Sequence, residues 1–483
     1  MPRPREQHRP VFICQDCGYE SARWLGFCPS PSCGSSQPLK ETDLFPAASS
    51  GRSWMSGLAE PLQELSRLDS ADQPRTQLPS SEINRVLGGG IVLGSVALLA
   101  GEPGVGKSTM LLQIAQFLAG QGKKVLYASG EESPHQVKLR SQRLGFPGEN
   151  IFLLSETDVD QLLGRLEQCL PALVIVDSIQ TLYTRDAPSG PGSVIQVREC
   201  GLRLMRWAKA RGVPLLIAGH VTKDGSLAGP RVLEHMVDIV MHLEGEDLNS
   251  YRVLRSSKNR FGSTSEVGVF EMTGQGLVEV PDPSQALLSQ RYEQAVGATL
   301  VPVLEGSRPL LLEIQALTSP SYAPAPRRVA NGVDYNRLLM LSTVATRRAG
   351  LEIAGQDIIV NVAGGFRVNE PAVDLGVVLS IASSLYNQPL ESGLVAFGEV
   401  GLSGELRNVP QVERRLMEAA RLGMSRCILP EHARSDFVNV PNIVLVYVRT
   451  LRQALRAALG ASRQASVRKA SPDVPYTGLE EGC

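Results

Sequence analysis

The chain has 483 residues, of which 43% are hydrophobic and 20% charged, a composition typical of a globular protein with room for two or three domains. Its 48 basic and 49 acidic residues nearly cancel, so any nucleic-acid surface must be local. The charged N-terminus has no apolar run behind it, and the longest apolar stretch, 91–100, is too short to span a bilayer. We therefore expect a cytoplasmic protein, in which structural disulfides are uncommon.

Four of the eight cysteines lie within the first 33 residues, spaced C-x2-C-x10-C-x4-C. Two close pairs on tight turns can bring four thiolates to one tetrahedral Zn²⁺, and so short a segment has too little core to fold without the metal. Reduced structural cysteines, a redox pair and an iron–sulfur cluster are the alternatives. We expect Tyr19 and Trp24 to pack against the metal core, with stacking on bases as the alternative. The sequence thus predicts a C4 zinc finger over residues 1–35, with the ligands Cys14, Cys17, Cys28 and Cys33.

Two polar stretches separate or follow the predicted domains. Residues 36–78 are predicted to be a linker, with a short helix at 54–68. Residues 461–483 are small and polar, and we expect a disordered tail there.

The most informative pattern begins with a β-rich run at 95–100. It leads into Gly101-x4-Gly106-Lys107-Ser108, and a helix with an apolar face follows. This is the strand–loop–helix context of a phosphate-binding loop, whose backbone N–H groups surround an anion at the helix N-terminus. Lys107 is expected to reach the β- and γ-phosphates of ATP, and the Ser108 hydroxyl to bind Mg²⁺. The predicted nucleotide-binding residues in this loop are Gly101, Glu102, Pro103, Gly104, Val105, Gly106, Lys107, Ser108 and Thr109.

Three further strands are expected to end in polar side chains beside this loop. The run PALVIVD ends in Asp177, which we predict to be the second Mg²⁺ ligand. The run KVLYASGEES ends in Glu131 and Glu132. Glu131 is predicted to be the general base that activates water, with Glu132 or a helix-capping role as the alternatives. The run VPLLIAGH ends in His220, which we expect to sense the γ-phosphate, although a lone strand-end histidine is as often structural.

Strands that alternate with helices through 95–245 predict a mainly parallel sheet with helices on both faces, an α/β domain over residues 79–280. Two connections in it, 184–200 and 222–231, are rich in Gly, Pro and polar residues. They are either surface turns or mobile loops that contact DNA.

The stretch SSKNRFG at 256–262 places two cations and an aromatic ring between two predicted strands. A solvated turn is the ordinary explanation for such a segment. The alternative is that Lys258 and Arg260 act in catalysis.

Together, the CxxC…C…C start and the motifs GEPGVGKST, ASGEES, VDSIQT, PGSVIQVRE and KNRFG resemble those of the bacterial RadA (Sms) family of DNA repair proteins. The resemblance covers nearly the entire chain, and KNRFG is its most specific motif. It implies a RecA-like ATPase similar to DnaB-type replicative helicases, which forms a hexameric ring and moves on single-stranded DNA during homologous recombination and branch migration. RecA recombinase is a candidate partner.

In such a ring each nucleotide lies between two subunits, so the neighbour must supply any cation that approaches from outside. Lys258 and Arg260 are therefore predicted to be catalytic across the interface. We expect them at a strand end beyond the nucleotide edge of the sheet.

Residues 285–460 resemble the peptidase domain of Lon proteases, which use a Ser–Lys dyad. The stretch that matches the nucleophile turn is Pro371-Ala372-Val373-Asp374, and Ala372 has no nucleophilic oxygen. Glu413, Arg414 and Arg415 stand near the place of the lysine, while Ser380 and Ser383 lie inside the following helix. We predict an α+β domain without peptidase activity. Its basic doublets are expected either to line a DNA channel or to be solvated: Arg327, Arg328, Arg347, Arg348, Arg414 and Arg415.

The sequence thus predicts a zinc finger, a RecA-like P-loop ATPase and an inactive Lon-like domain, with ATP, Mg²⁺ and Zn²⁺ as cofactors. The predicted activity is DNA-dependent ATP hydrolysis. One alternative is an ATP-dependent protease, and the other is a RecA-fold ATP switch that does not act on DNA.

Overall fold

The computed structural model describes residues 10–14, 20–21, 23–29, 33, 39–43, 74–187, 189–220, 231–245, 251–289, 291–292, 294–323, 325–436 and 440–460. The chain divides into two compact units, Met1–Pro281 and Asp282–Cys483. In these described ranges, no helix is long and apolar enough to cross a membrane.

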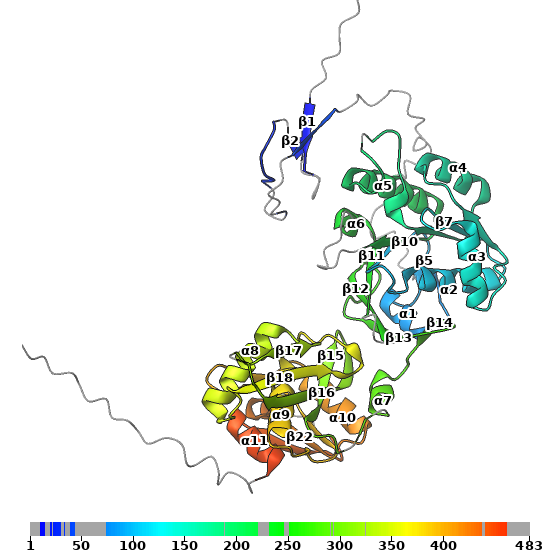
Figure 1. Ribbon diagram of the computed structural model, residues 1–483. Helices are drawn as coiled ribbons and strands as arrows, with labels where there is room; N and C mark the ends of the chain where they lie inside the picture. The colour runs from blue at the N-terminus through cyan, green and yellow to red at the C-terminus, as the bar shows by residue number, and fades with distance from the viewer. Residues whose placement is uncertain are drawn as a thin grey trace, which may run out of the picture. The chain divides into compact units, whose positions relative to one another are not determined.

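The first unit is built on a nine-stranded sheet in the order β14-β13-β12-β11-β6-β10-β9-β7-β8 (Figure 1). The strands from β8 to β11 in this order run parallel, and β12, β13 and β14 are antiparallel additions at one edge. The bounds are β6 (Val96–Gly101), β7 (Val125–Ser129), β8 (Ile151–Leu154), β9 (Leu173–Asp177), β10 (Leu215–His220), β11 (Ile239–Glu244), β12 (Tyr251–Asn259), β13 (Val267–Thr273) and β14 (Gly276–Glu279). The predicted mainly parallel sheet is confirmed.

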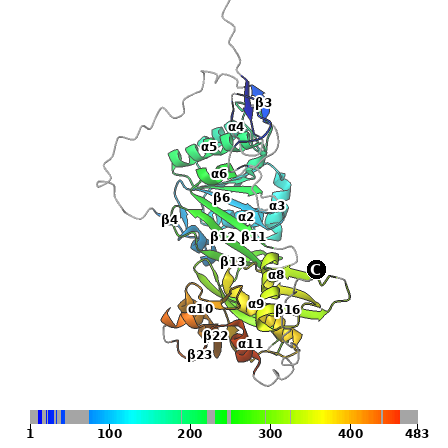
Figure 2. The ribbon, with the colours of Figure 1, turned by 90° about the vertical axis from the view of Figure 1, so that its left-hand side faces the viewer.

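Helices cover both faces of this sheet because the side chains of each buried strand alternate between two cores. Ala97 and Leu99 of β6 belong to one core with the first helices, whereas Val96 and Leu98 belong to the other. Figures 1 and 2 show α4, α5 and α6 on the face opposite to α2. The helices are α1 (Ser81–Leu87), α2 (Lys107–Gly120), α3 (Pro134–Arg143), α4 (Val159–Cys169), α5 (Val194–Arg211) and α6 (Arg231–Met236).

Short strands complete the first unit. At its start, β1 (Pro10–Ile13) pairs with β2 (Glu20–Ser21) and β3 (Lys40–Asp43), and these three strands form a small antiparallel sheet. Further along, β4 (Arg75–Thr76) pairs with β5 (Ile91–Val92).

The second unit contains a mixed seven-stranded sheet in the order β17-β18-β16-β15-β19-β22-β23. Its strands are β15 (Ala298–Glu305), β16 (Arg308–Pro320), β17 (Arg328–Asn331), β18 (Gln356–Val362), β19 (Leu394–Ala396), β22 (Arg426–Pro430) and β23 (Val444–Val448), with a separate hairpin of β20 (Glu399–Val400) and β21 (Leu406–Arg407). Its helices are α7 (Pro283–Leu288), α8 (Tyr335–Val344), α9 (Asp374–Leu385), α10 (Val412–Arg421) and α11 (Leu451–Leu459).

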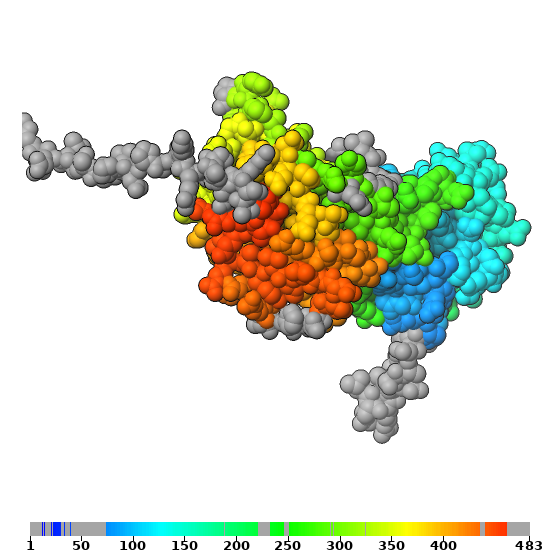
Figure 3. All heavy atoms as spheres, turned by 90° about the horizontal axis from the view of Figure 1, so that it is seen from below, coloured from blue at the N-terminus to red at the C-terminus, as the bar shows by residue number. Residues whose placement is uncertain are grey.

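Helix α9 is the central helix of this unit. It is buried from Asp374 to Ser383 and packs on β15 and β16. The segments from α10 to α11, orange to red in Figure 3, form one continuous face of the unit. The predicted α+β domain is confirmed.

Several predictions concern residues outside the described ranges. These are the ligand role of Cys17, the packing of Tyr19, the short helix at 54–68, the DNA-contacting loop at 222–230 and the disordered tail at 461–483.

Candidate functional site

The phosphate loop joins β6 to α2 at the carboxyl edge of the parallel sheet. Gly106 is the N-cap of α2 and has φ 115°, a backbone conformation open to glycine but costly for other residues. A side chain there would also meet Met272, since a Cβ would lie 2.5 Å from its Cε atom. No side chain caps α2, so its first N–H groups remain available to an anion.

Lys107 is the first residue of α2 and is buried. Its Nζ donates to the carbonyl oxygens of Gly101 and Glu102, at 2.8 and 2.9 Å. Burial lowers the pKa of Lys107, although Asp177 and Glu131 oppose the shift. The ammonium group is therefore held within the loop by neutral carbonyls.

Asp177 ends β9, next to β10, which itself lies beside β6. The hydroxyl of Tyr127, on β7, donates to Asp177 Oδ2 at 2.6 Å. Burial, and then the charge of Asp177, raise the pKa of Tyr127 well above its ordinary value, so this donor stays protonated. The sequence analysis did not identify Tyr127. The sequence signal that could have indicated this residue is its hydroxyl group, which stands alone in the otherwise apolar run VLYA.

Glu131 follows β7 at the same edge and faces the phosphate loop. Its Oε1 accepts hydrogen bonds from Ser178 Oγ and from His220 Nε2, the latter at 2.9 Å. Burial raises the pKa of Glu131, but the bonds from Ser178 and His220 outweigh it, and the pKa lies below its usual value. His220 ends β10 and pairs in register with Gly101, so the structure brings it beside the loop. Ser178 is a further residue that the sequence analysis missed.

Glu132 lies in a different environment from Glu131. Both its oxygens accept from the guanidinium of Arg140 on α3, each at 2.6 Å. This bidentate ion pair engages both oxygens of Glu132 with one guanidinium and offsets the charge of the carboxylate. Glu132 therefore ties α3 to the end of β7.

Lys258 and Arg260 lie at the opposite end of the sheet from the phosphate loop of their own chain, which corrects our expectation. In the register of the sheet, Ile239 pairs with Ala97 at the start of β6 and with Asn259, whereas Gly101 pairs with Leu243. Because β12 is antiparallel to β11, its C-terminus points away from the nucleotide edge.

The side chains of the KNRFG segment have partners within the chain. Lys258 Nζ donates to the carbonyl oxygens of Glu234 and His235 in α6, and Arg260 bonds Asp238 at 3.0 Å. Gly262 passes so close to the C-cap of α1 that a Cβ would lie 2.7 Å from the Cα atom of Gly88. This segment comprises the end of β12 and the start of the turn that follows it, and contacts within the chain hold it in place.

The connection 184–200 is shorter than predicted, because α5 already begins at Val194. The side chain of Gln196, on α5, bonds the backbone of Thr184, Ala187 and Ser189. These bonds hold the described part of the connection against its own helix.

The cysteines at the start of the chain converge. The Sγ atoms of Cys14, Cys28 and Cys33 lie within 4.8 Å of one another, and those of Cys14 and Cys33 are 3.7 Å apart. Thiolates at the corners of a tetrahedron around Zn²⁺ are about 3.8 Å apart. The donor chemistry and the spacing of these three residues fit a zinc site.

The packing predicted for Trp24 is wrong. Its side chain is 62% exposed and that of Phe27 66%, whereas Leu25 packs against the cysteine cluster with Leu39. Among the described residues, the aliphatic side chain of Leu25 and not the indole ring packs against the cysteines.

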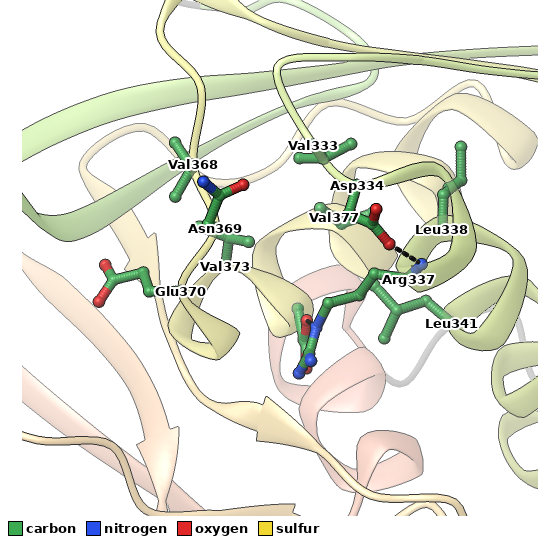
Figure 4. A pocket seen from close by; sticks show the side chains of 11 residues that line it. Val333, Asp334, Arg337, Leu338, Leu341, Val368, Asn369, Glu370, Val373 and Val377 are labelled. Carbon is green, nitrogen blue, oxygen red and sulfur yellow. Dashed lines mark hydrogen bonds and ion pairs between the residues drawn. The ribbon is translucent and has the colours of Figure 1, made fainter. Parts of the chain in front are cut away.

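A cavity of about 310 Å³ in the second unit lies beside residues 371–374, the stretch that matches the nucleophile turn of Lon proteases. Figure 4 shows Val368, Asn369 and Glu370 on one side of it and Asp334, Leu338 and Leu341 on the other. Its described lining contains no Ser, Thr, Cys, Lys or His: Val333, Asp334, Arg337, Leu338, Leu341, Val368, Asn369, Glu370, Val373, Asp374 and Val377.

Ion pairs occupy the region where a peptidase would need a nucleophile and an amine. Arg337 bonds both oxygens of Asp374 at 2.6 and 2.5 Å. Arg415 is fully buried and bonds both oxygens of Glu370 at 2.8 and 2.6 Å. Arg415 therefore cannot line a channel, which corrects that expectation, whereas Arg414 is exposed.

Ser380 and Ser383 on α9 are buried away from the cavity lining. Ser380 Oγ donates toward the carbonyl oxygens of Ile314 and Gly376, and Ser383 Oγ toward that of Gln388. Both hydroxyls serve the packing of the helix.

The fold and the phosphate loop of the first unit define a RecA-like P-loop protein, in which β10 separates the loop strand β6 from the Asp177 strand β9. The second unit is a Lon-like domain. Residues 59–226 match the family described as AAA domain, and residues 340–433 match subunit ChlI of Mg-chelatase.

Three curated relatives, each named DNA repair protein RadA, match nearly the whole chain. The protein from Halalkalibacterium halodurans is 47% identical over 452 residues, which cover 93% of this chain and 98% of that protein. Those from Bacillus subtilis and Haemophilus influenzae are each 46% identical, covering 93% and 92% of this chain and 98% of each relative. The chain belongs to the RadA family of DNA repair proteins, as its motifs predicted.

Proposed function

We propose that this protein is an ATPase of DNA repair and recombination that hydrolyses ATP to move along single-stranded DNA. The observation that carries the proposal is the convergence of Lys107, Asp177 and Glu131 at one sheet edge, in a member of the RadA family. Positive and negative groups face each other across an open helix N-terminus there, as nucleotide hydrolysis requires.

In this proposal the phosphates of ATP lie against residues 101–109. The Lys107 ammonium leaves the carbonyls of Gly101 and Glu102 for the phosphate oxygens, which hold it more strongly because they are charged. Ser108 and Asp177 would hold Mg²⁺, which neutralises charge on the phosphates when bound. Tyr127 fixes the orientation of Asp177.

Glu131 is the proposed general base. Its ionised carboxylate takes a proton from the attacking water, and His220 beside it meets the γ-phosphate. Glu132 is not proposed for this task because Arg140 holds both its oxygens.

We also propose a hexameric, DnaB-like ring, in which Lys258 and Arg260 approach the nucleotide of a neighbouring subunit. Their place at the opposite end of the sheet supports action across an interface, since they are remote from the loop of their own chain. RecA recombinase remains the proposed partner, and the cytoplasm the proposed location.

Neither alternative function is favoured. A Lon-type protease would need a hydroxyl nucleophile at the turn 371–374, and the described residues that line the cavity beside that turn include no Ser, Thr or Cys. An ATP switch that does not act on DNA would be unusual in a family of DNA repair proteins.

Three variants test the proposed hydrolysis. Lys107→Ala should abolish turnover, and Glu131→Gln should bind ATP but hydrolyse it about 10²–10⁴-fold more slowly, because general-base catalysis is lost. Glu132→Gln is the matched control and should keep turnover within about threefold, since its side chain contacts Arg140 and not the loop. Phosphate release and binding of a fluorescent ATP analogue report the two steps. Equal turnover in Glu131→Gln and the unmodified protein would reject Glu131 as the base.

A further inference from the structure

Ser178 lies at the catalytic edge of the sheet in a fixed position. It is fully buried, directly follows Asp177 and precedes the short 3₁₀ helix Ile179–Thr181. The Thr181 hydroxyl donates to the Ser178 carbonyl oxygen at 2.8 Å, which closes this turn.

The loop that carries Glu131 is tied to the same turn. Gly130 N donates to the Asp177 carbonyl oxygen at 3.1 Å. A Cβ at Gly130 would lie 2.0 Å from Thr181 Oγ1, so the Thr181 side chain packs on the Gly130 backbone as closely as only a glycine permits. The backbones of Ser178 and Glu131 are thus held at a constant separation.

The hydrogen bonds to the two neighbouring glutamates differ in kind. Glu132 is held through both oxygens by one guanidinium, whereas Glu131 is held through Oε1 alone, by the Ser178 hydroxyl and the His220 ring. In the described part of the chain, no hydrogen bond reaches Glu131 Oε2. Two donors on one oxygen fix the rotation of a carboxylate and leave its other oxygen open.

We propose that Ser178 is a positioning residue for ATP hydrolysis, which with His220 orients the Glu131 carboxylate so that Oε2 accepts the proton of the attacking water. The inference rests on the proposed role of Glu131 as the base. A neutral hydroxyl suits this task, because it directs the carboxylate without placing a full positive charge on it. Its bond to Glu131 helps keep the pKa of that carboxyl low, which keeps the base ionised.

Glu131 needs such a hold because its side chain is 42% exposed and long enough to adopt several rotamers. A misplacement of about 1 Å at a reacting group can cost on the order of 10² in rate. Binding of ATP does not depend on the orientation of Glu131, since the phosphate loop and Lys107 supply the contacts.

The test is Ser178→Ala in the full-length protein. The kcat for ATP hydrolysis should fall about 10–100-fold, while the KM and the affinity for a fluorescent ATP analogue stay within about twofold. Ser95→Ala is the matched control: Ser95 is also buried and its hydroxyl also donates one hydrogen bond, to the Val92 carbonyl oxygen, but Ser95 lies just before β6, at the end of that strand away from the phosphate loop. That variant should keep kcat within about twofold.

A double-mutant cycle separates positioning from general damage. In a Glu131→Gln background, Ser178→Ala should cause no further loss in single-turnover hydrolysis, because the group it orients is already gone. Losses that multiply in the double variant would show that Ser178 does not act through Glu131, and a kcat unchanged in Ser178→Ala would overturn the inference directly. If Ser178→Ala loses ATP binding, Ser178→Cys, which keeps the volume with a much weaker donor, gives the same decision.

The outcomes also separate this inference from the proposed function. Slow hydrolysis in Glu131→Gln with normal hydrolysis in Ser178→Ala would reject the positioning role alone. Normal hydrolysis in Glu131→Gln would reject the assignment of the base.

Discussion

The two neighbouring carboxylates after β7 differ in task because their partners differ. Glu131 faces Lys107 and accepts hydrogen bonds from the Ser178 hydroxyl and the His220 ring, whereas Glu132 is paired with a guanidinium on α3. Both lie in the same short turn and share their chemistry, so only the side-chain contacts distinguish them. The same principle applies in the second unit, where Arg415 and Arg414 are neighbours on α10 but only Arg415 is buried.

Removal of Arg415 should destabilise the second unit. Arg415→Ala leaves the Glu370 carboxylate and the Pro302 carbonyl without their guanidinium partner, at a cost of about 3–5 kcal/mol. Calorimetry of the full chain should show one transition at lower temperature with ATP binding preserved. Arg414→Ala, on the same helix but exposed, is the control and should change stability by about 0.5 kcal/mol or less. Equal effects of the two variants would show that the ion pair adds no stability.

Much of the nucleotide edge could be predicted from the sequence, because strand-end residues of a parallel sheet meet at one edge. This places Lys107, Asp177, Glu131 and His220 together from pattern alone. Tyr127 and Ser178 could not be found in that way. Their roles depend on contacts between strands that the chain order does not reveal, as does the burial of Arg415.

At the scale of elements, strand direction decides what the KNRFG segment can reach. The sheet changes from parallel to antiparallel between β11 and β12, so Lys258 lies near the start of β6. Alternating residues predict a strand but not its direction, which explains the error in the expected position. The segment also holds α6 through Lys258 and α1 through Asn259, which bonds the Val86 carbonyl at 3.0 Å.

Two inactive variants can test whether Lys258 acts in a neighbouring subunit. We expect Lys258→Ala to bind ATP and DNA but to lose hydrolysis, since a cation that acts across an interface is worth about 10³–10⁵ in rate. Mixed with Lys107→Ala, it should regain part of the activity, because some interfaces then pair an intact loop with an intact Lys258. Hydrolysis in the mixture is the measurement.

The control mixes the single variant Lys258→Ala with a double variant that carries both Lys107→Ala and Lys258→Ala. In this mixture no subunit has Lys258. If the subunits exchange and the first mixture stays inactive, Lys258 does not act in a neighbouring subunit. Its hydrogen bonds to α6 would then account for its role.

At the scale of the whole molecule, the cysteine cluster is expected to bind its own metal ion. The purified protein should contain about one zinc per chain, and Cys28→Ser should lose it, because Cys28 is one of the three described thiols that converge on the predicted site. Metal analysis by mass spectrometry gives the stoichiometry. Cys427→Ser, at a buried cysteine of the second unit, is the control and should keep the zinc. Stoichiometric iron in place of zinc would contradict the assignment.

The central claim is that ATP hydrolysis is coupled to single-stranded DNA, and the most direct measurement is the hydrolysis rate with and without that DNA. We predict a rate several-fold higher with DNA, lost in Lys107→Ala. Although the net charge is only −1, the stimulation should weaken steeply as salt rises, since phosphate contacts release counterions. An equal rate with and without DNA at low salt would contradict the account and favour an ATP switch that does not act on DNA.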